Sequence, residues 1–190
     1  MNPAEYLALE TLRDGRQALI RALLPSDRES MLAAVDRMGE ASLYRRFFAP
    51  RRGFTEAELA YYLEVDFVRH VALVCEFEEG GTRLIAGGGR YVVTEPASAE
   101  MAFVVDDPHH GLGIGTLLMR HLVAIARATG LQTLTAEFLA ENTPMLSVFR
   151  RSGLPLRLTR DGSVTLAHMD CRHGSDTKGD DDRSLIQGAH

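Results

Sequence analysis

Three glycines at alternate positions, Gly111, Gly113 and Gly115, restrict the possible folds of this chain more than any other feature. They follow a mostly apolar, strand-like segment at residues 99–105. They precede a segment with apolar residues at helical spacing, residues 117–129. The first N–H groups of a helix lack intrahelical partners, and the helix dipole adds partial positive charge there. A strand, a glycine-rich turn and a helix N-terminus therefore predict a site for a phosphate.

Two common phosphate-binding loops do not fit these residues. A P-loop requires a lysine after its last glycine, whereas Gly115 is followed directly by Thr116. A dinucleotide fingerprint requires glycines at its first, third and sixth positions, and the sixth position counted from Gly111 is Thr116. A tight turn without a ligand is the remaining structural alternative. It would leave three glycines that only weaken the local structure.

Hydrophobic periodicity predicts a mixed α/β (α+β) domain. Thr55 with Glu58, and Ser26 with Glu29, have the spacing of capping boxes that begin helices. A helix is also expected around residues 41–48, and another between Asn142 and Gly153. The expected strands are residues 17–23, 71–77, 84–93, 99–105, 134–139, 154–158 and 164–169, with a further extended piece before residue 12.

The bulk properties limit the classes of partner. The chain has 190 residues, with 21 basic and 26 acidic side chains and a formal net charge of −5, which gives no support for nucleic-acid binding. No run approaches the ~18 apolar residues that cross a bilayer, and the N-terminus lacks a signal pattern. We expect a cytoplasmic monomer or homodimer without membrane contact. No Cys/His spacing resembles a zinc site, so no metal is expected.

One domain is expected over residues 12–170, followed by a polar, disordered tail over residues 171–190. A local basic cluster, Arg45, Arg46, Arg51 and Arg52, stands out against the acidic background. It is interpreted either as a solvated loop or as a patch that faces an anionic ligand.

Glu100 is the candidate catalytic residue. It is a lone carboxylate in an otherwise apolar strand, and alternation places it with Ala102 and Val104, opposite Met101 and Phe103. A charge on that strand is costly unless it faces a cleft or solvent, and both remain open.

The order of motifs resembles the GNAT superfamily of N-acetyltransferases, in particular the acetyltransferase domain of bacterial Pat-type protein lysine acetyltransferases. The loop at residues 110–115 is similar to the Gln/Arg-x-x-Gly-x-Gly/Ala pyrophosphate loop of that family, with His110 in the first position. The segments at residues 42–48, 99–105, 141–146 and 149–154 carry the rest of the resemblance. It implies the GNAT fold, a mixed sheet of about seven strands flanked by about four or five helices.

The resemblance also implies the site. It places the general base of the family at Glu100. A tyrosine that protonates the leaving thiolate in many members is replaced here by Phe149. Asn142 would contact the cofactor arm, or serve only as a helix cap. Coenzyme A binding is implied for Phe103, Val104, Val105, His110, Gly111, Leu112, Gly113, Ile114, Gly115, Thr116, Asn142, Met145 and Phe149.

The resulting expectation is an N-acyltransferase that moves an acetyl group from acetyl-CoA, or another short acyl-CoA, directly to an amine. Protein lysine is one candidate acceptor, and a small-molecule amine is another. A non-catalytic acyl-CoA-binding sensor is the alternative from a different class, because His110 and Phe149 depart from the usual pattern.

Overall fold

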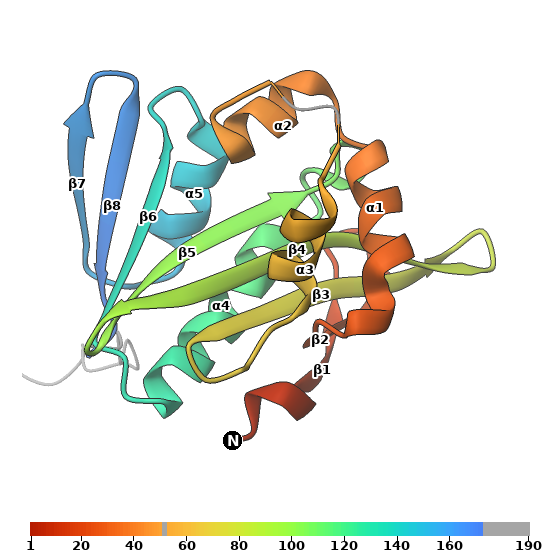
Figure 1. Cartoon of the computed structure of the whole chain (residues 1–190), viewed down its shortest axis with the longest axis horizontal. Helices are drawn as coiled ribbons and strands as arrows, with labels where there is room; N and C mark the ends of the chain where they lie inside the picture. The colour runs from red at the N-terminus through yellow and green to blue at the C-terminus, as the bar shows by residue number, and fades with distance from the viewer. Residues whose placement is uncertain (51–52, 173–190) are drawn as a thin grey trace, which may run out of the picture.

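The computed structural model describes residues 1–50 and 53–172. Within them lies one eight-stranded sheet with the strand order β1-β2-β3-β4-β5-β6-β8-β7 (Figure 1). Neighbouring strands are antiparallel except β5 and β6, which are parallel. The strands are β1 (Leu7–Thr11), β2 (Gln17–Ala22), β3 (His70–Glu79), β4 (Thr82–Glu95), β5 (Ser98–Val105), β6 (Thr133–Leu139), β7 (Leu156–Asp161) and β8 (Val164–Asp170).

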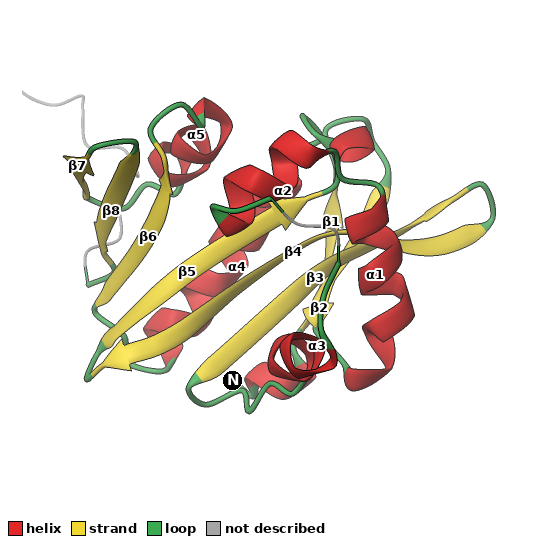
Figure 2. Ribbon diagram, turned by 45° about the horizontal axis from the view of Figure 1, so that its top comes forward, coloured by secondary structure: helices red, strands yellow, loops and turns green. Residues whose placement is uncertain are grey.

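The helices form a layer on each side of this sheet (Figure 2). Helices α1, α2 and α3 lie over one face, whereas α4 covers the other and packs beside α5. Short 3-10 helices precede β1, α1 and α4. The five α-helices of the described residues are α1 (Arg28–Asp36), α2 (Glu40–Phe47), α3 (Glu56–Leu63), α4 (Ile114–Ala128) and α5 (Thr143–Arg151).

The mixed α/β fold expected from the sequence is confirmed, with one strand more than expected. That strand is β1, where the sequence predicted only an extended piece before residue 12, and it pairs with β2 at the edge of the sheet. Leu7 and Leu9 are exposed on it, so the strand carries little of the burial signal that periodicity detects. The tail expected from residue 171 lies outside the described residues except for Cys171 and Arg172.

The main core lies between the sheet and α4. The side of α4 that faces the sheet carries large apolar residues at helical spacing, and Leu118, Leu122 and Ile125 are completely buried. Gly130 follows the helix with a φ of +84°, a conformation that favours glycine at a helix end. No helix of the described residues is long and apolar enough to span a membrane.

The two expected capping boxes differ in outcome. The one at Thr55 and Glu58 is confirmed and begins α3. The one at Ser26 is wrong: Ser26 is exposed, and Asp27 accepts a hydrogen bond from the Leu24 N–H at 2.8 Å instead. Arg21 binds the Asp27 carboxylate at 2.7 and 2.9 Å and fixes it in this place. A charged, bidentate contact of this kind is stronger than one to a hydroxyl.

Candidate active site

The site begins where two neighbouring strands separate. Parallel pairing between β5 and β6 covers only three residue pairs and ends at Glu100 with Thr135, although β5 continues to Val105 and β6 to Leu139. Figure 2 shows the two strands diverging from this point towards α5. The sheet is therefore interrupted in its middle, between two strands that are each paired on their outer side.

The inner edge of β5 leaves backbone polar groups without a partner strand. The Asp106 N–H donates to the Ala86 carbonyl at 2.9 Å, so this residue and the alternate residues before it face β4. Alternation then directs the N–H and C=O groups of Met101, Phe103 and Val105 towards the gap. Such groups need hydrogen-bond partners. An extended ligand lying in the gap can supply them.

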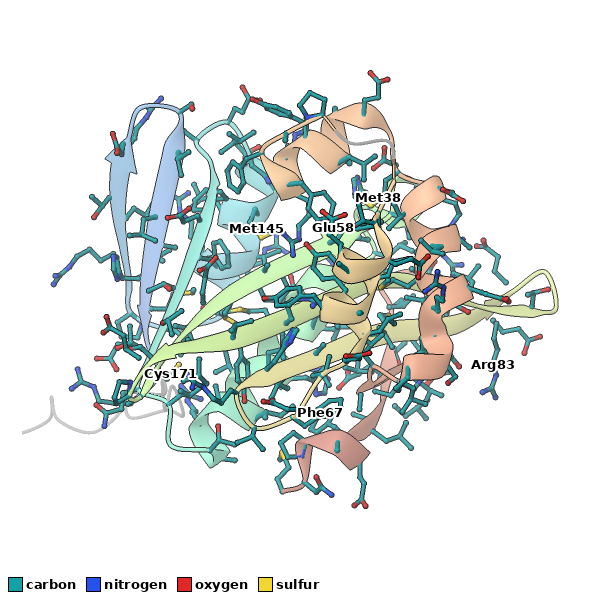
Figure 3. All side chains as sticks on the ribbon, viewed as in Figure 1. Met38, Glu58, Phe67, Arg83, Met145 and Cys171 are labelled. Carbon is teal, nitrogen blue, oxygen red and sulfur yellow. The ribbon has the colours of Figure 1, made fainter. Side chains whose placement is uncertain are left out.

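A cavity of about 470 Å³ occupies this gap and extends to the glycine loop. That volume is in the range of small-molecule sites. Met38, after α1, and Met145, on α5, are both labelled in Figure 3 and both line it. The sequence-predicted residues that line the cavity are Glu100, Phe103, Val104, Val105, His110, Gly111, Gly113, Ile114, Gly115, Thr116, Asn142, Met145 and Phe149.

Leu112 is the expected site residue that does not line the cavity. Its side chain packs against the main core, and its carbonyl accepts a hydrogen bond from the Arg13 N–H at 3.1 Å. Leu112 thus attaches the loop to the core on the side away from the cavity.

The glycine loop has the geometry of an anion site. Gly111 and Gly113 have φ values of +81° and +91°, a region that other residues rarely adopt. Gly113 immediately precedes α4, and the first helical hydrogen bond runs from the Leu117 N–H to its carbonyl at 3.0 Å. Across the described residues, the backbone N–H groups of residues 111–116 have no acceptor. These donors are available to an oxygen-rich ligand.

Gly115 has a packing role in addition to the one expected in the loop. A Cβ atom placed there would lie 3.2 Å from Cγ2 of Val148, which is tighter than most contacts of that kind. Gly115 therefore allows α5 to approach α4 closely. Its small size shapes the cavity wall at the junction of the two helices.

Side chains from remote segments hold the loop in place. Arg13, in the turn between β1 and β2, donates from Nη1 to the Gly111 carbonyl at 3.1 Å. The buried His109 contacts the Asp106 carboxylate at 2.5 Å, and Arg37 contacts the other oxygen of that carboxylate at 2.6 Å. His110 contacts the Val105 carbonyl at 2.9 Å through Nε2. These contacts connect the loop and the residues just before it to the β1–β2 turn, to the end of α1 and to β5.

Glu100 is exposed and lines the cavity at the point where β5 and β6 separate. Its neighbours on the same strand, Met101 and Phe103, are buried beneath it on the opposite face. The alternation expected from the sequence is confirmed, and the side chain meets both solvent and the cavity. A carboxylate in that position can accept a proton from a group bound in the cavity.

The far wall of the cavity comes from α5. Asn142 caps this helix, and its side-chain oxygen accepts a hydrogen bond from the Met145 N–H at 3.2 Å. Phe149 is almost fully buried between the rings of Phe103 and Phe138, at centroid distances of 6.2 and 5.5 Å. Phe149 has no hydroxyl and therefore cannot donate a proton.

Sequence reasoning missed several cations that line the cavity. Arg13 and Arg151 are among them. Arg13 lies in the turn between β1 and β2, and Arg151 lies in the segment at residues 149–154, for which the resemblance implied no role of an arginine. Arg45 and Arg46 on α2 also line it, which favours the interpretation of the basic cluster as a patch facing an anion. The other half of that cluster, Arg51 and Arg52, lies outside the described residues.

In the part of the chain that the structure describes, no group of three metal-ligating side chains occurs.

Comparison with known proteins identifies one family, because the matching family model and the similar protein are both acetyltransferases. Residues 40–154 match the model of the acetyltransferase (GNAT) family. An acetyltransferase of Pseudomonas aeruginosa is 30% identical over 161 residues, which cover 84% of this chain and 87% of that protein.

Two solved structures bear on the fold. The GNAT domain of S. lividans PAT has a TM-score of 0.77 and 31% identity, and the match covers 86% of this chain and 96% of that domain. The yncA protein of Salmonella typhimurium, a putative acetyltransferase solved with its cofactor acetyl-CoA, has a TM-score of 0.64. Its identity is 18%, with 88% of this chain and 99% of that one covered, so it supports the fold alone.

Proposed function

The chain belongs to the GNAT acetyltransferase family, and from this premise we propose that it transfers an acetyl group from acetyl-CoA to an amine, with Glu100 as general base. One observation carries the proposal. The unpaired N–H groups of residues 111–116 and the exposed carboxylate of Glu100 line the same cavity, at the two ends of the open β5 edge.

The proposed cofactor fits the chemistry of this cavity. A pyrophosphate would lie on the N–H groups of residues 111–116, with Arg13 near the loop and further arginines on α2 and α5 adding positive charge. The pantetheine arm contains amides and would pair with the backbone N–H and C=O groups of Phe103 and with the N–H of Val105, whose carbonyl already contacts His110. This orientation carries the thioester along β5 towards Glu100.

The proposed reaction is a direct transfer. An ammonium with a pKa of about 10.4 is protonated near neutral pH and is not nucleophilic. Glu100 accepts a proton from it, directly or through a water molecule. The amine nitrogen then attacks the thioester carbonyl carbon and the C–S bond breaks. The nitrogen gives up its second proton to solvent, which leaves a neutral amide, and the departing thiolate takes a proton from solvent. A thiol with a pKa of about 8.5 is a good leaving group, so Phe149 need not supply an acid.

The donor is acetyl-CoA or another short acyl-CoA. The acetyltransferase name of the Pseudomonas aeruginosa relative favours the acetyl group. Protein lysine is the acceptor that the Pat-type resemblance implies, and a small amine is the other candidate. A cytoplasmic monomer or homodimer completes the proposal, with a domain that spans residues 12–170 and includes strand β1 before them.

Release of free thiol from acetyl-CoA tests the proposal. Purified protein is incubated with acetyl-CoA and a panel of amines that includes lysine peptides and small amines, and acetylated product is identified by mass spectrometry. We expect thiol and acetyl-amine in equal amounts with at least one amine. Tight binding of acetyl-CoA without thiol release on any amine would support the non-catalytic sensor instead.

A further inference from the structure

Arg90 lies on the same face of the sheet as Glu100 and has no part in the proposed reaction. In the register of the sheet, Arg90 on β4 pairs with Ala72 on β3 and with Ala102 on β5. Both neighbours end in a methyl group. The long side chain of Arg90 is therefore flanked on the sheet by two small residues, and one of them, Ala102, lines the main cavity.

The small residues leave a second hollow, of about 80 Å³, beneath α1 and α3. Arg90 lines it together with apolar side chains that include Val35 and Phe54. Met38, Arg46, Ala102 and Val104 line this hollow and the main cavity as well, among other residues. The two spaces thus adjoin across Ala102, on the side of β5 that carries Glu100.

The groups that Arg90 contacts in the described part of the chain are all neutral. Its Nη1 donates to His70 Nε2 at 3.0 Å, and its Nη2 donates to the Tyr62 carbonyl at 3.3 Å. The guanidinium also lies 4.5 Å from the centre of the Tyr62 ring. Among the described residues, no carboxylate forms an ion pair with Arg90. Five N–H donors in a planar fork are suited to a carboxylate, and buried cations in proteins are usually paired with one.

The electrostatics of the hollow agree with this geometry. Burial, and then the guanidinium of Arg46, lower the pKa of Arg90 to about 10, so the side chain still carries its charge at neutral pH. Burial and the charge of Arg90 lower the pKa of His70 to about 4, so His70 is neutral and accepts the hydrogen bond. The carboxylate of Asp106 lines the hollow too, but it is already bound to Arg37 and His109.

We infer that Arg90 binds a carboxylate of the acceptor, so that the acceptor is an amine with a carboxylate a few bonds away. The inference rests on the proposed function, because it places the amine at Glu100. Arg90 pairs with Ala102, two residues from Glu100 on the same face. Residues in that diagonal relation have Cβ atoms about 7–8 Å apart or somewhat less. An acceptor of amino-acid type can span that separation.

Matched acids and amides test this inference. The acceptors are glycine, β-alanine, γ-aminobutyrate and δ-aminovalerate, each compared with its amide. For the best chain length we expect the acid to exceed its amide in kcat/KM by about ten- to hundredfold, mainly through KM, the usual effect of a charged hydrogen bond. The Arg90→Lys variant should lose most of that preference, because a lysine cannot form the bidentate contact. Equal rates for acids and amides would overturn the inference.

Arg83→Lys is the control variant. Arg83 lies on the same strand but far along the β3–β4 hairpin, where its side chain points to solvent (Figure 3). It should keep the full preference for the acid. If Arg90→Lys keeps the preference as well, Arg90 does not bind the acceptor.

A binding measurement separates failure of the inference from failure of the proposed function. Propionate should raise the melting temperature of the wild-type protein and of Arg83→Lys, but not that of Arg90→Lys. If no amine releases thiol from acetyl-CoA, the transferase proposal fails, and this shift still decides whether Arg90 binds carboxylates. Should Arg90→Lys not fold, competition between propionate and the amino-acid acceptors in the wild-type protein replaces it, and absence of competition would contradict the inference.

Discussion

Two titratable side chains on one face of the sheet have opposite surroundings. Glu100 is exposed at the mouth of the cavity, whereas His70 is buried between the Tyr61 ring, at a centroid distance of 5.3 Å, and the guanidinium of Arg90. An exposed carboxylate can exchange protons with a ligand and with solvent. A buried histidine next to a cation stays neutral. His70 therefore remains uncharged at pH values where a free histidine would bind a proton.

Replacement of Glu100 tests the proposed base. Glu100→Gln should lower kcat by about 10²–10³-fold near neutral pH, the usual contribution of a general base. The loss should shrink as the pH approaches the pKa of the amine, because the acceptor then loses its proton without help. Affinity for CoA should not change. Steady-state rates between pH 6 and pH 9 measure this.

Glu137→Gln is the matched variant, since Glu137 is also exposed and lines the opposite wall of the cavity on β6. We expect only a small effect from it. If Glu137→Gln lost most of its activity while Glu100→Gln kept full activity, the general base would be Glu137 on β6 and not Glu100.

The lowered pKa of His70 predicts a loss of stability in acid. An unfolded histidine binds a proton below about pH 6.5, whereas folded His70 does so only near its pKa of about 4. Between these values the unfolded state binds more protons, so the free energy of unfolding falls as the pH falls. The contribution of His70 is about 2 kcal/mol between pH 7 and pH 5. Urea denaturation of wild type and His70→Gln should show a shallower pH dependence in the variant. Parallel curves would contradict the assignment.

At the scale of elements, the helices and strands were largely predictable and the gap between them was not. Glycines, capping residues and hydrophobic periods act over a few residues, so α3, α4 and the β3–β4–β5 meander could be predicted from the sequence. The divergence of β5 from β6 depends on how α5 and α2 pack near them, which no local pattern encodes. The hydrogen bond that holds the glycine loop at the Gly111 carbonyl comes from Arg13, almost 100 residues earlier in the chain.

The candidate site was predictable only in part for the same reason. The loop and Glu100 were predicted from local patterns of residues, and the family resemblance added Asn142 and Phe149. Arg90 follows three glycines in a strand, and nothing in that pattern indicates burial beneath α3. Its neighbours come from three other elements and become adjacent only in the folded sheet.

The loop and the far end of α4 offer a matched pair of glycines. Gly111 and Gly130 have φ values of +81° and +84°, and a Cβ atom at either would meet no atom within 4 Å. Alanine at either position should therefore lower the free energy of unfolding by about 1–2 kcal/mol through backbone strain alone. Only Gly111→Ala should also weaken CoA binding, by about tenfold, the loss of roughly one hydrogen bond to phosphate. Equal affinity for CoA in both variants, measured by calorimetry, would show that the loop is not part of the CoA-binding site.

At the scale of the whole molecule, a ligand that spans the gap should stabilise the fold. The gap interrupts the central sheet, so a ligand there links its two parts. At a concentration of 100 times its Kd, acetyl-CoA should add about 2.7 kcal/mol, and the melting temperature of a domain of this size should rise by about 5–10 °C. Pantetheine, which lacks the pyrophosphate, should give a much smaller rise at the same concentration. Equal shifts would show that the loop contributes nothing to binding.

A crystal structure with acetyl-CoA would show where each part of the cofactor binds. We expect pyrophosphate oxygens about 3 Å from the N–H groups of residues 111–116, and pantetheine amides paired with the free edge of β5 at Phe103 and Val105. We also expect the acetyl group on the side of the gap that holds Glu100. Coenzyme A bound away from the loop, or with its acetyl group remote from Glu100, would show that the proposed site is wrong.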